Sequence, residues 1–287
     1  MRLRQALCGV DRAVARILSE QDVRRRPPID IGALASRYGA RVELAPIDQD
    51  GFMVDEGSSA ILVVRESDAW ARRRFTAAHE LAHWLIRGPH ARTVGIDHVA
   101  AAFRSEEMLC NSFAAALLMP LEWLRGTFYP QWGPDTAPRF ALIAELARQT
   151  DSSLAAATVR MRDVFNWPSV ALHWAYLNGA WHYAGEAGLF PWEQGAVSPS
   201  RNVDLVLAGL RADRQSTRSH STDAVKIRLP LSIERREDDH PAEVIFQGNT
   251  ASALIELPGR LAPRGEQYAR ACEARNRGQG IAWSMVD

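Results

Sequence analysis

Residues 74–83 read Arg-Phe-Thr-Ala-Ala-His-Glu-Leu-Ala-His, and they carry the pattern that decides how the first half of the chain is organised. They fall within Trp70–Ile86, where apolar residues recur at helical spacing until Gly88-Pro89 ends the run. We therefore predict one long helix here. On a helix, the four-residue spacing of His79 and His83 places both imidazoles on one face, about one turn apart.

The arrangement H-E-x-x-H on a helix is typical of a zinc site with hydrolytic chemistry. His79 and His83 are predicted to hold the metal, because two imidazoles one turn apart can reach the same ion. Glu80 lies one step further round the helix and is predicted to act as the general base on a water molecule at the metal. The flanking residues are apolar, so unpaired imidazoles at these positions would be costly.

A catalytic zinc site needs a third protein ligand and one open position. The metzincin arrangement is excluded, since Gly88 and His90 do not fall at the required spacing after His83. A carboxylate from the next predicted helix, Glu106–Met119, is the remaining source. Glu106 and Glu107 both stand at its start, and the spacing alone does not choose between them.

Four other side chains near this region have relevant chemistry. His90 and His98 are rival ligands, although exposed loop histidines are more often simply solvated. Together with Tyr129 they are also eligible to stabilise an oxyanion. Cys110 follows the two glutamates on the same helix, and we interpret it as a small buried residue before a redox-sensitive thiol.

The rest of the chain alternates between helical and strand patterns. Helices are predicted at Leu3–Val23, Ile29–Tyr38, Pro138–Gln149 and Ser152–Phe165, and strands at 41–45, 59–64, Val170–Tyr176, Ala180–Tyr183, Val225–Ile233, Ala242–Phe246 and Ala253–Leu257. Asn178-Gly179 predicts a hairpin turn. Arg211–Asp223, rich in Arg, Ser and Thr, is predicted to be a mobile loop.

Composition excludes several classes of protein. Lys plus Arg and Asp plus Glu number 34 each, so no net charge directs the chain toward nucleic acid or anionic lipid. No apolar run approaches the roughly 20 residues that span a bilayer. The first residues lack a signal-peptide pattern, and three scattered cysteines predict no disulfide framework. We expect a cytoplasmic protein with no membrane association.

Two linked segments, 74–83 and 107–120, make the sequence similar to the ImmA/IrrE metallopeptidases. In that family, the third zinc ligand is the glutamate four residues before the asparagine of the second segment. Here the asparagine is Asn111, so the resemblance assigns the role to Glu107. It implies Zn²⁺ as the cofactor, with Mn²⁺ as an alternative that the ligand types do not exclude.

The resemblance also implies an α+β architecture in three parts. A mainly helical zincin-like peptidase domain with a small sheet would occupy residues 1–130, a helix-turn-helix-like helical segment 131–167, and a GAF-like α+β sensor domain 168–287, with a small ligand as its expected partner. Members of the family cleave helix-turn-helix repressors and so derepress stress, DNA-damage or mobile-element genes. The expected substrate is thus an XRE-type repressor supplied in trans.

Two hypotheses from other classes stay open. In the first, Ala141–Val164 is a DNA-binding helix-turn-helix with Arg148, Arg160 and Arg162 on phosphate, although the apolar residues of both helices need a core. In the second, the chain is a zinc-bound sensor without catalysis. Replacing Glu80 by Gln separates that sensor from a peptidase, because only a peptidase would lose its output.

Overall fold

The structure is a computed structural model that describes residues 3–20, 26–96, 99, 103, 105–128, 140–165, 169–187, 197–200, 202–216, 225–233, 236–247 and 250–256. These residues form two compact units. The first contains the described residues up to Phe128 together with Leu146–Ser153. The second contains Phe140–Glu145 and the described residues from Leu154 onward.

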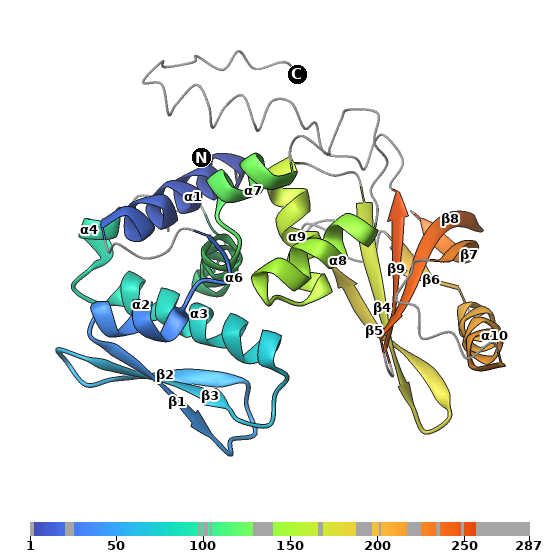
Figure 1. The fold of residues 1–287 in the computed structure, drawn as a ribbon, viewed down its shortest axis with the longest axis horizontal. Helices are drawn as coiled ribbons and strands as arrows, with labels where there is room; N and C mark the ends of the chain where they lie inside the picture. Colours follow the sequence, from blue (N-terminus) through green and yellow to red (C-terminus); the bar gives the residue numbers. More distant parts are fainter. Residues whose placement is uncertain are drawn as a thin grey trace, which may run out of the picture. The chain divides into compact units, whose positions relative to one another are not determined.

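The first unit is mainly helical, with one small sheet (Figure 1). Its elements are α1 (Leu3–Glu20), α2 (Ile31–Arg37), β1 (Ala40–Ala45), β2 (Gly51–Asp55), β3 (Ala60–Arg65), α3 (Trp70–Arg87), α4 (Ala91–Val94), α6 (Glu106–Leu118) and α7 (Leu121–Phe128). The strand order is β1-β3-β2, with β1 parallel and β2 antiparallel to β3. Strand β2 therefore lies at an edge of this sheet.

Helix α3 is held by contacts on two sides. One side packs on the sheet, chiefly against β2 and β3, and the other packs on α6. Its Trp84 is 1% exposed, and its indole N–H donates to the carbonyl oxygen of Tyr38 at 2.7 Å. Burial of a residue this large stabilises the unit by a few kcal/mol, because apolar area leaves water and the one polar atom stays paired.

Helix α6 is buried over most of its surface. Its residues from Phe113 to Leu118 are all 4% exposed or less, so it has no solvated face in that stretch. Helices α3 and α1 both contact it. A helix that is apolar all round belongs in the interior, and α6 is the element around which this unit packs.

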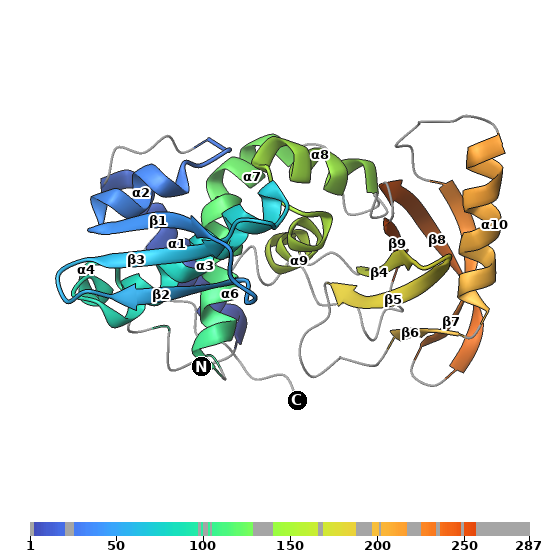
Figure 2. The same ribbon diagram turned by 90° about the horizontal axis from the view of Figure 1, so that it is seen from below.

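The second unit contains a six-stranded antiparallel sheet in the order β5-β4-β9-β8-β7-β6. The strands are β4 (Ser169–Leu177), β5 (Ala180–Ala187), β6 (Val197–Pro199), β7 (Val225–Ile233), β8 (Arg236–Gln247) and β9 (Thr250–Glu256). Helix α9 (Leu154–Phe165) contacts β4 and β5, and α10 (Val203–Ser216) covers the other face (Figures 1 and 2). The core under α10 includes Trp174, Leu207 and Leu229.

The hairpin predicted at Asn178-Gly179 is present between β4 and β5. Both residues have positive φ, 52° and 84°, as the two-residue turn with the favoured twist requires. The loop predicted over Arg211–Asp223 is wrong in its first part, because α10 continues to Ser216. The guanidinium of Arg211 lies 3.9 Å from the ring centre of Tyr176 on β4. This cation–π contact attaches α10 to the sheet. Residues 217–223 are outside the described residues.

The helices predicted at Pro138–Gln149 and Ser152–Phe165 are present as α8 (Phe140–Thr150) and α9. The DNA-binding hypothesis predicts that three arginines of these helices contact phosphate, and this prediction is wrong for two of them. Arg160 and Arg162 are each only 2% exposed, so they cannot reach phosphates from this fold. Arg148 alone is exposed.

The fold class is α+β, as predicted. No helix among the described residues is both long and apolar enough to cross a membrane.

His173 on β4 makes the second unit sensitive to acid. Its Nδ1 lies 2.8 Å from the hydroxyl of Ser252 on β9, and burial lowers its pKa to about 4. In the unfolded chain, this histidine has a pKa near 6.5 and takes up a proton at a higher pH than it does in the folded state. Acid therefore favours the unfolded chain. The contribution of His173 to the free energy of unfolding should be fully present above about pH 6.5, and this free energy should fall by roughly 3 kcal/mol as the pH drops toward 4.

The substitution His173→Asn should flatten this dependence in thermal unfolding of the full chain between pH 7 and pH 5. The matched control is His182→Asn, since His182 is exposed on the neighbouring strand. Equal pH slopes for the parent and His173→Asn would contradict the assignment.

Candidate metal centre

Helix α3 presents His79, Glu80 and His83 toward the start of α6. The side chains of His79 and His83 are 14% and 7% exposed, and Glu80 is buried. On the same helix, the apolar residues Ala78, Leu81 and Ala82 are fully buried. The buried residues of α3 therefore hold the helix in place in the core. The position of the helix then determines where the three polar side chains point.

The start of α6 supplies two consecutive carboxylates. Ser105 caps this helix, its hydroxyl accepting a hydrogen bond from the N–H of Met108 at 3.2 Å. Glu106 and Glu107 occupy the first turn, where the partial positive charge of the helix N-terminus favours negative groups. Capping and the helix dipole explain why two acids are tolerated side by side here.

The structure brings three of the predicted site residues together. The Nε2 atoms of His79 and His83 lie 3.1 Å apart. Glu107 completes the triangle, with Oε2 at 3.1 Å from His79 Nε2 and Oε1 at 3.2 Å from His83 Nε2. Tetrahedral zinc with bonds of about 2.0–2.1 Å separates its ligand atoms by roughly 3.3 Å. The spacing of the three groups therefore fits one such ion.

The outer nitrogens of both imidazoles have partners of their own. His79 Nδ1 lies 2.9 Å from Oδ1 of Asn111, and His83 Nδ1 lies 2.6 Å from Oε1 of Glu106. With a proton on each Nδ1 donating to these oxygens, both Nε2 atoms carry lone pairs. Burial, and then the neighbouring His83, lower the pKa of His79, which favours the neutral ring. In this tautomer, a cation between the converging acceptor atoms would satisfy all of them.

Glu80 is placed beside this triangle without joining it. Within the described residues, it belongs to neither group of side chains that could share a metal ion. Burial raises the pKa of its carboxyl, and the nearby His83 partly opposes this. A carboxylate with raised pKa is a stronger base than an exposed one, as a general base requires.

Two predictions about rival groups can be compared with the structure. His90 lies against the rings of Tyr38 and Trp84, with ring centres 5.1 and 6.2 Å away, and is in neither candidate ligand group. His98 and Tyr129 are outside the described residues. Cys110 is fully buried, and burial raises the pKa of its thiol, so the expectation of a small buried residue holds.

Cys110 nevertheless belongs to a second group that could hold a metal, with His83 and Glu106. This group fits less well. A thiol must lose its proton to bind a metal, and the surroundings of Cys110 oppose that loss. Glu106 also accepts from Arg87, whose Nε lies 2.7 Å from the same oxygen that faces His83. Sequence reasoning missed Arg87, although its position four residues after His83 places it on the same helical face.

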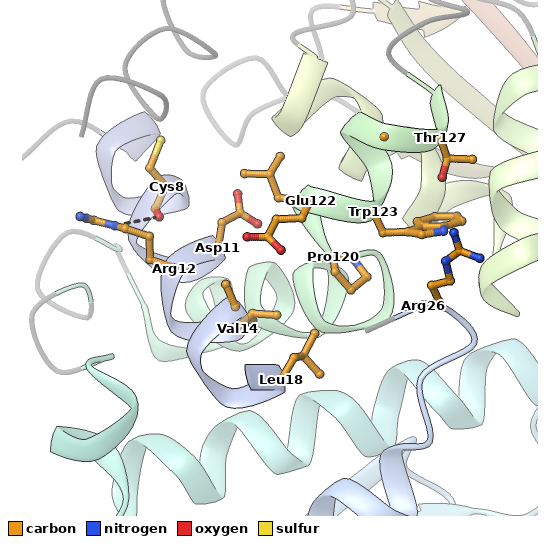
Figure 3. A pocket seen from close by; sticks show the side chains of 13 residues that line it. Cys8, Asp11, Arg12, Val14, Leu18, Arg26, Pro120, Glu122, Trp123 and Thr127 are labelled. Carbon is orange, nitrogen blue, oxygen red and sulfur yellow. Dashed lines mark hydrogen bonds between the residues drawn. The ribbon is translucent and has the colours of Figure 1, made fainter. Parts of the chain in front are cut away.

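A cavity elsewhere in the first unit does not include these residues. It has a volume of about 660 Å³ and is lined by α1 and α7, with Leu18, Trp123 and Arg26 among its residues (Figure 3). It contains no histidine and none of the residues of the triangle. The residues that line this cavity include none of the groups of side chains that could share a metal ion.

Strand β2 passes close to Glu80. A Cβ atom built on Gly51 would lie 3.7 Å from Cγ of Glu80, 2.5 Å from Cγ2 of Thr76 and 2.7 Å from the carbonyl oxygen of Val63. Only glycine therefore allows the edge strand this near to α3. Sequence analysis did not predict β2, because its five residues show little alternation and follow a polar turn.

Comparison with known proteins agrees with these motifs. Residues 35–162 match the model of the IrrE N-terminal-like domain, a peptidase family. The radiation response metalloprotease IrrE of Deinococcus deserti is 39% identical over 89 residues, which is 30% of this chain and 30% of that protein. Residues 35–162 are therefore similar to the ImmA/IrrE metallopeptidases. The matched part spans about a third of the curated relative.

A solved structure resembles the chain in fold. A Mycobacterium tuberculosis transcriptional regulator superposes with a TM-score of 0.50 at 15% identity, covering 89% of this chain and 82% of the other. At this identity the likeness concerns the fold alone.

The close approach at Gly51 gives a prediction. Gly51→Ala should lower the free energy of unfolding by about 1–3 kcal/mol, because the new methyl group meets a backbone carbonyl that cannot easily move. Gly126→Ala is the matched control. It lies in α7 with nothing within 4 Å of the added Cβ, so it should leave stability unchanged or raise it by about 0.5–1 kcal/mol. Thermal unfolding measures both, and equal shifts would contradict the packing described.

Proposed function

We propose that the chain is a zinc-dependent, site-specific endopeptidase. The observation that carries this proposal is the triangle of His79 Nε2, His83 Nε2 and Glu107, whose atoms lie 3.1–3.2 Å apart. His79, His83 and Glu107 would hold the ion, and Glu80 would be the catalytic base. The match of residues 35–162 to a metallopeptidase family supports hydrolysis of a peptide bond.

When bound, zinc would supply Lewis acidity, polarising the scissile carbonyl and making water acidic enough to attack near neutral pH. Glu80 would take the proton of that water and return it to the leaving amine. Its burial supports the first of these steps, since a raised pKa makes the carboxylate a stronger base. Asn111 and Glu106 would keep the imidazoles in the tautomer that offers Nε2. Mn²⁺ remains an alternative metal.

The edge of β2 supports an extended peptide as the substrate. Just outside the two ends of β2, the backbone N–H of Arg65 donates to the carbonyl oxygen of Asp50, and that of Glu56 donates to the carbonyl oxygen of Ser59. Because backbone hydrogen bonds alternate along an antiparallel pair, the even-numbered residues of β2 make the hydrogen bonds to β3. Gly51, Met53 and Asp55 then direct their N–H and C=O groups away from the sheet. A substrate strand added at this edge would run past Glu80, which lies beside Gly51.

The proposed substrate is an XRE-type helix-turn-helix repressor supplied in trans, whose cleavage in the cytoplasm would derepress stress-response, DNA-damage or mobile-element genes. The family resemblance and the name of the Deinococcus relative support this choice. We further propose a zincin-like domain over 1–130, a helix-turn-helix-like segment over 131–167 and a GAF-like sensor domain over 168–287 that binds a small ligand. The six-stranded sheet flanked by α9 and α10 is compatible with the last of these.

Direct binding of DNA is disfavoured as the main function. Two of its three proposed phosphate contacts, Arg160 and Arg162, are buried. The metal-bound sensor without catalysis is tested by the experiment below.

The test is a cleavage assay with zinc-loaded protein and the helix-turn-helix repressor encoded nearest to its gene, read by intact mass. The parent should make one cut. Glu80→Gln should keep the metal and lose at least about 100-fold in rate, because proton transfer by a positioned base contributes 10²–10⁴. Glu66→Gln, an exposed glutamate before α3, is the control and should cut normally. If no repressor of several tried is cut by zinc-loaded parent, the chain is a sensor.

A further inference from the structure

Glu106 and Glu107 flank the same imidazole from opposite sides. Glu107 Oε1 lies 3.2 Å from Nε2 of His83, while Glu106 Oε1 lies 2.6 Å from its Nδ1. Both residues are glutamates in the first turn of one helix, so composition does not decide which of them reaches the metal. Something else in the site must separate their roles.

Arg87 distinguishes the two carboxylates. It lies one turn after His83 on α3, and its Nε is 2.7 Å from Glu106 Oε1. The same oxygen lies within hydrogen-bond distance of His83 Nδ1. Within the described residues, Glu107 has no corresponding arginine contact. The contact with Arg87 therefore holds Glu106 on the Nδ1 side of His83.

The Arg87–Glu106 pair contributes little to folding. Their side chains are 55% and 36% exposed, and solvated ion pairs of this kind add little to stability. The pair instead affects the orientation of the His83 ring. A carboxylate that accepts from the outer nitrogen of a metal-binding histidine fixes the ring and its tautomer, and losing such a partner weakens metal binding about 10–100-fold.

We propose that Glu106 is a positioning residue that orients His83 for the metal, and that Arg87 acts through Glu106 by keeping it off the metal, so that Glu107 is the ligand. This inference rests on the proposed function, since it assumes that His79, His83 and Glu107 hold the ion. It adds two residues to that site, one from each helix, which the H-E-x-x-H pattern does not include.

The test measures zinc affinity of the full chain by competition with a chromophoric chelator. Glu106→Ala should weaken binding about 10–100-fold, and Glu106→Gln, which keeps an acceptor oxygen, should weaken it less. Arg87→Met keeps the aliphatic stem and should weaken binding in the parent, yet have no further effect in Glu106→Ala. Arg37→Met, an exposed arginine on α2, is the control and should leave affinity unchanged.

The Co²⁺ spectrum separates positioning from direct ligation. Glu106→Gln should keep the visible absorption of the Co²⁺-loaded parent, because the atoms bound to the metal are the same. Unchanged affinity in Glu106→Ala, additive effects of the two substitutions, or loss of the parent spectrum in Glu106→Gln would overturn the inference. If the parent itself binds no zinc, the proposed function fails instead, so the two failures are distinguishable.

Discussion

Helix α6 packs against α3 because both helices bury small and apolar side chains along their contact, and the geometry of the site depends on this packing. Leu81 and Ala82 on α3 and Phe113 and Ala114 on α6 are all fully buried. Close packing of this kind tolerates little displacement. The first turn of α6 consequently meets the histidine face of α3 at a fixed distance. Small residues at this contact thus serve the chemistry as well as the fold.

The same packing creates an electrostatic demand. Two imidazole nitrogens and a carboxylate converge within 3.2 Å at the edge of an apolar interior, and none of the three groups can donate to the others when each neutral ring carries its proton on Nδ1. Their outer nitrogens are already occupied by Asn111 and Glu106. A bound cation would satisfy all three acceptors at once, which is the physical basis of the proposed metal site.

Local pattern was enough to predict α3, α6 and the roles proposed for His79, Glu80 and His83, because helical period and four-residue spacing are local properties. The choice of Glu107 over Glu106 needed the family resemblance, and only the fold shows what Glu106 does instead. Strand β2 was missed because its position depends on the contact of Gly51 with α3, which joins residues far apart in sequence. The helical part of Arg211–Ser216 was missed for a similar reason, since its packing on Tyr176 overrides a polar local composition.

X-ray absorption at the zinc edge reports directly which atoms bind the metal. Protein loaded with one equivalent of zinc should show nitrogen and oxygen neighbours at about 2.0–2.1 Å, with the scattering pattern of two imidazoles and no sulfur. A sulfur neighbour at about 2.3 Å would place the metal with Cys110, in the second candidate group, and would contradict the account.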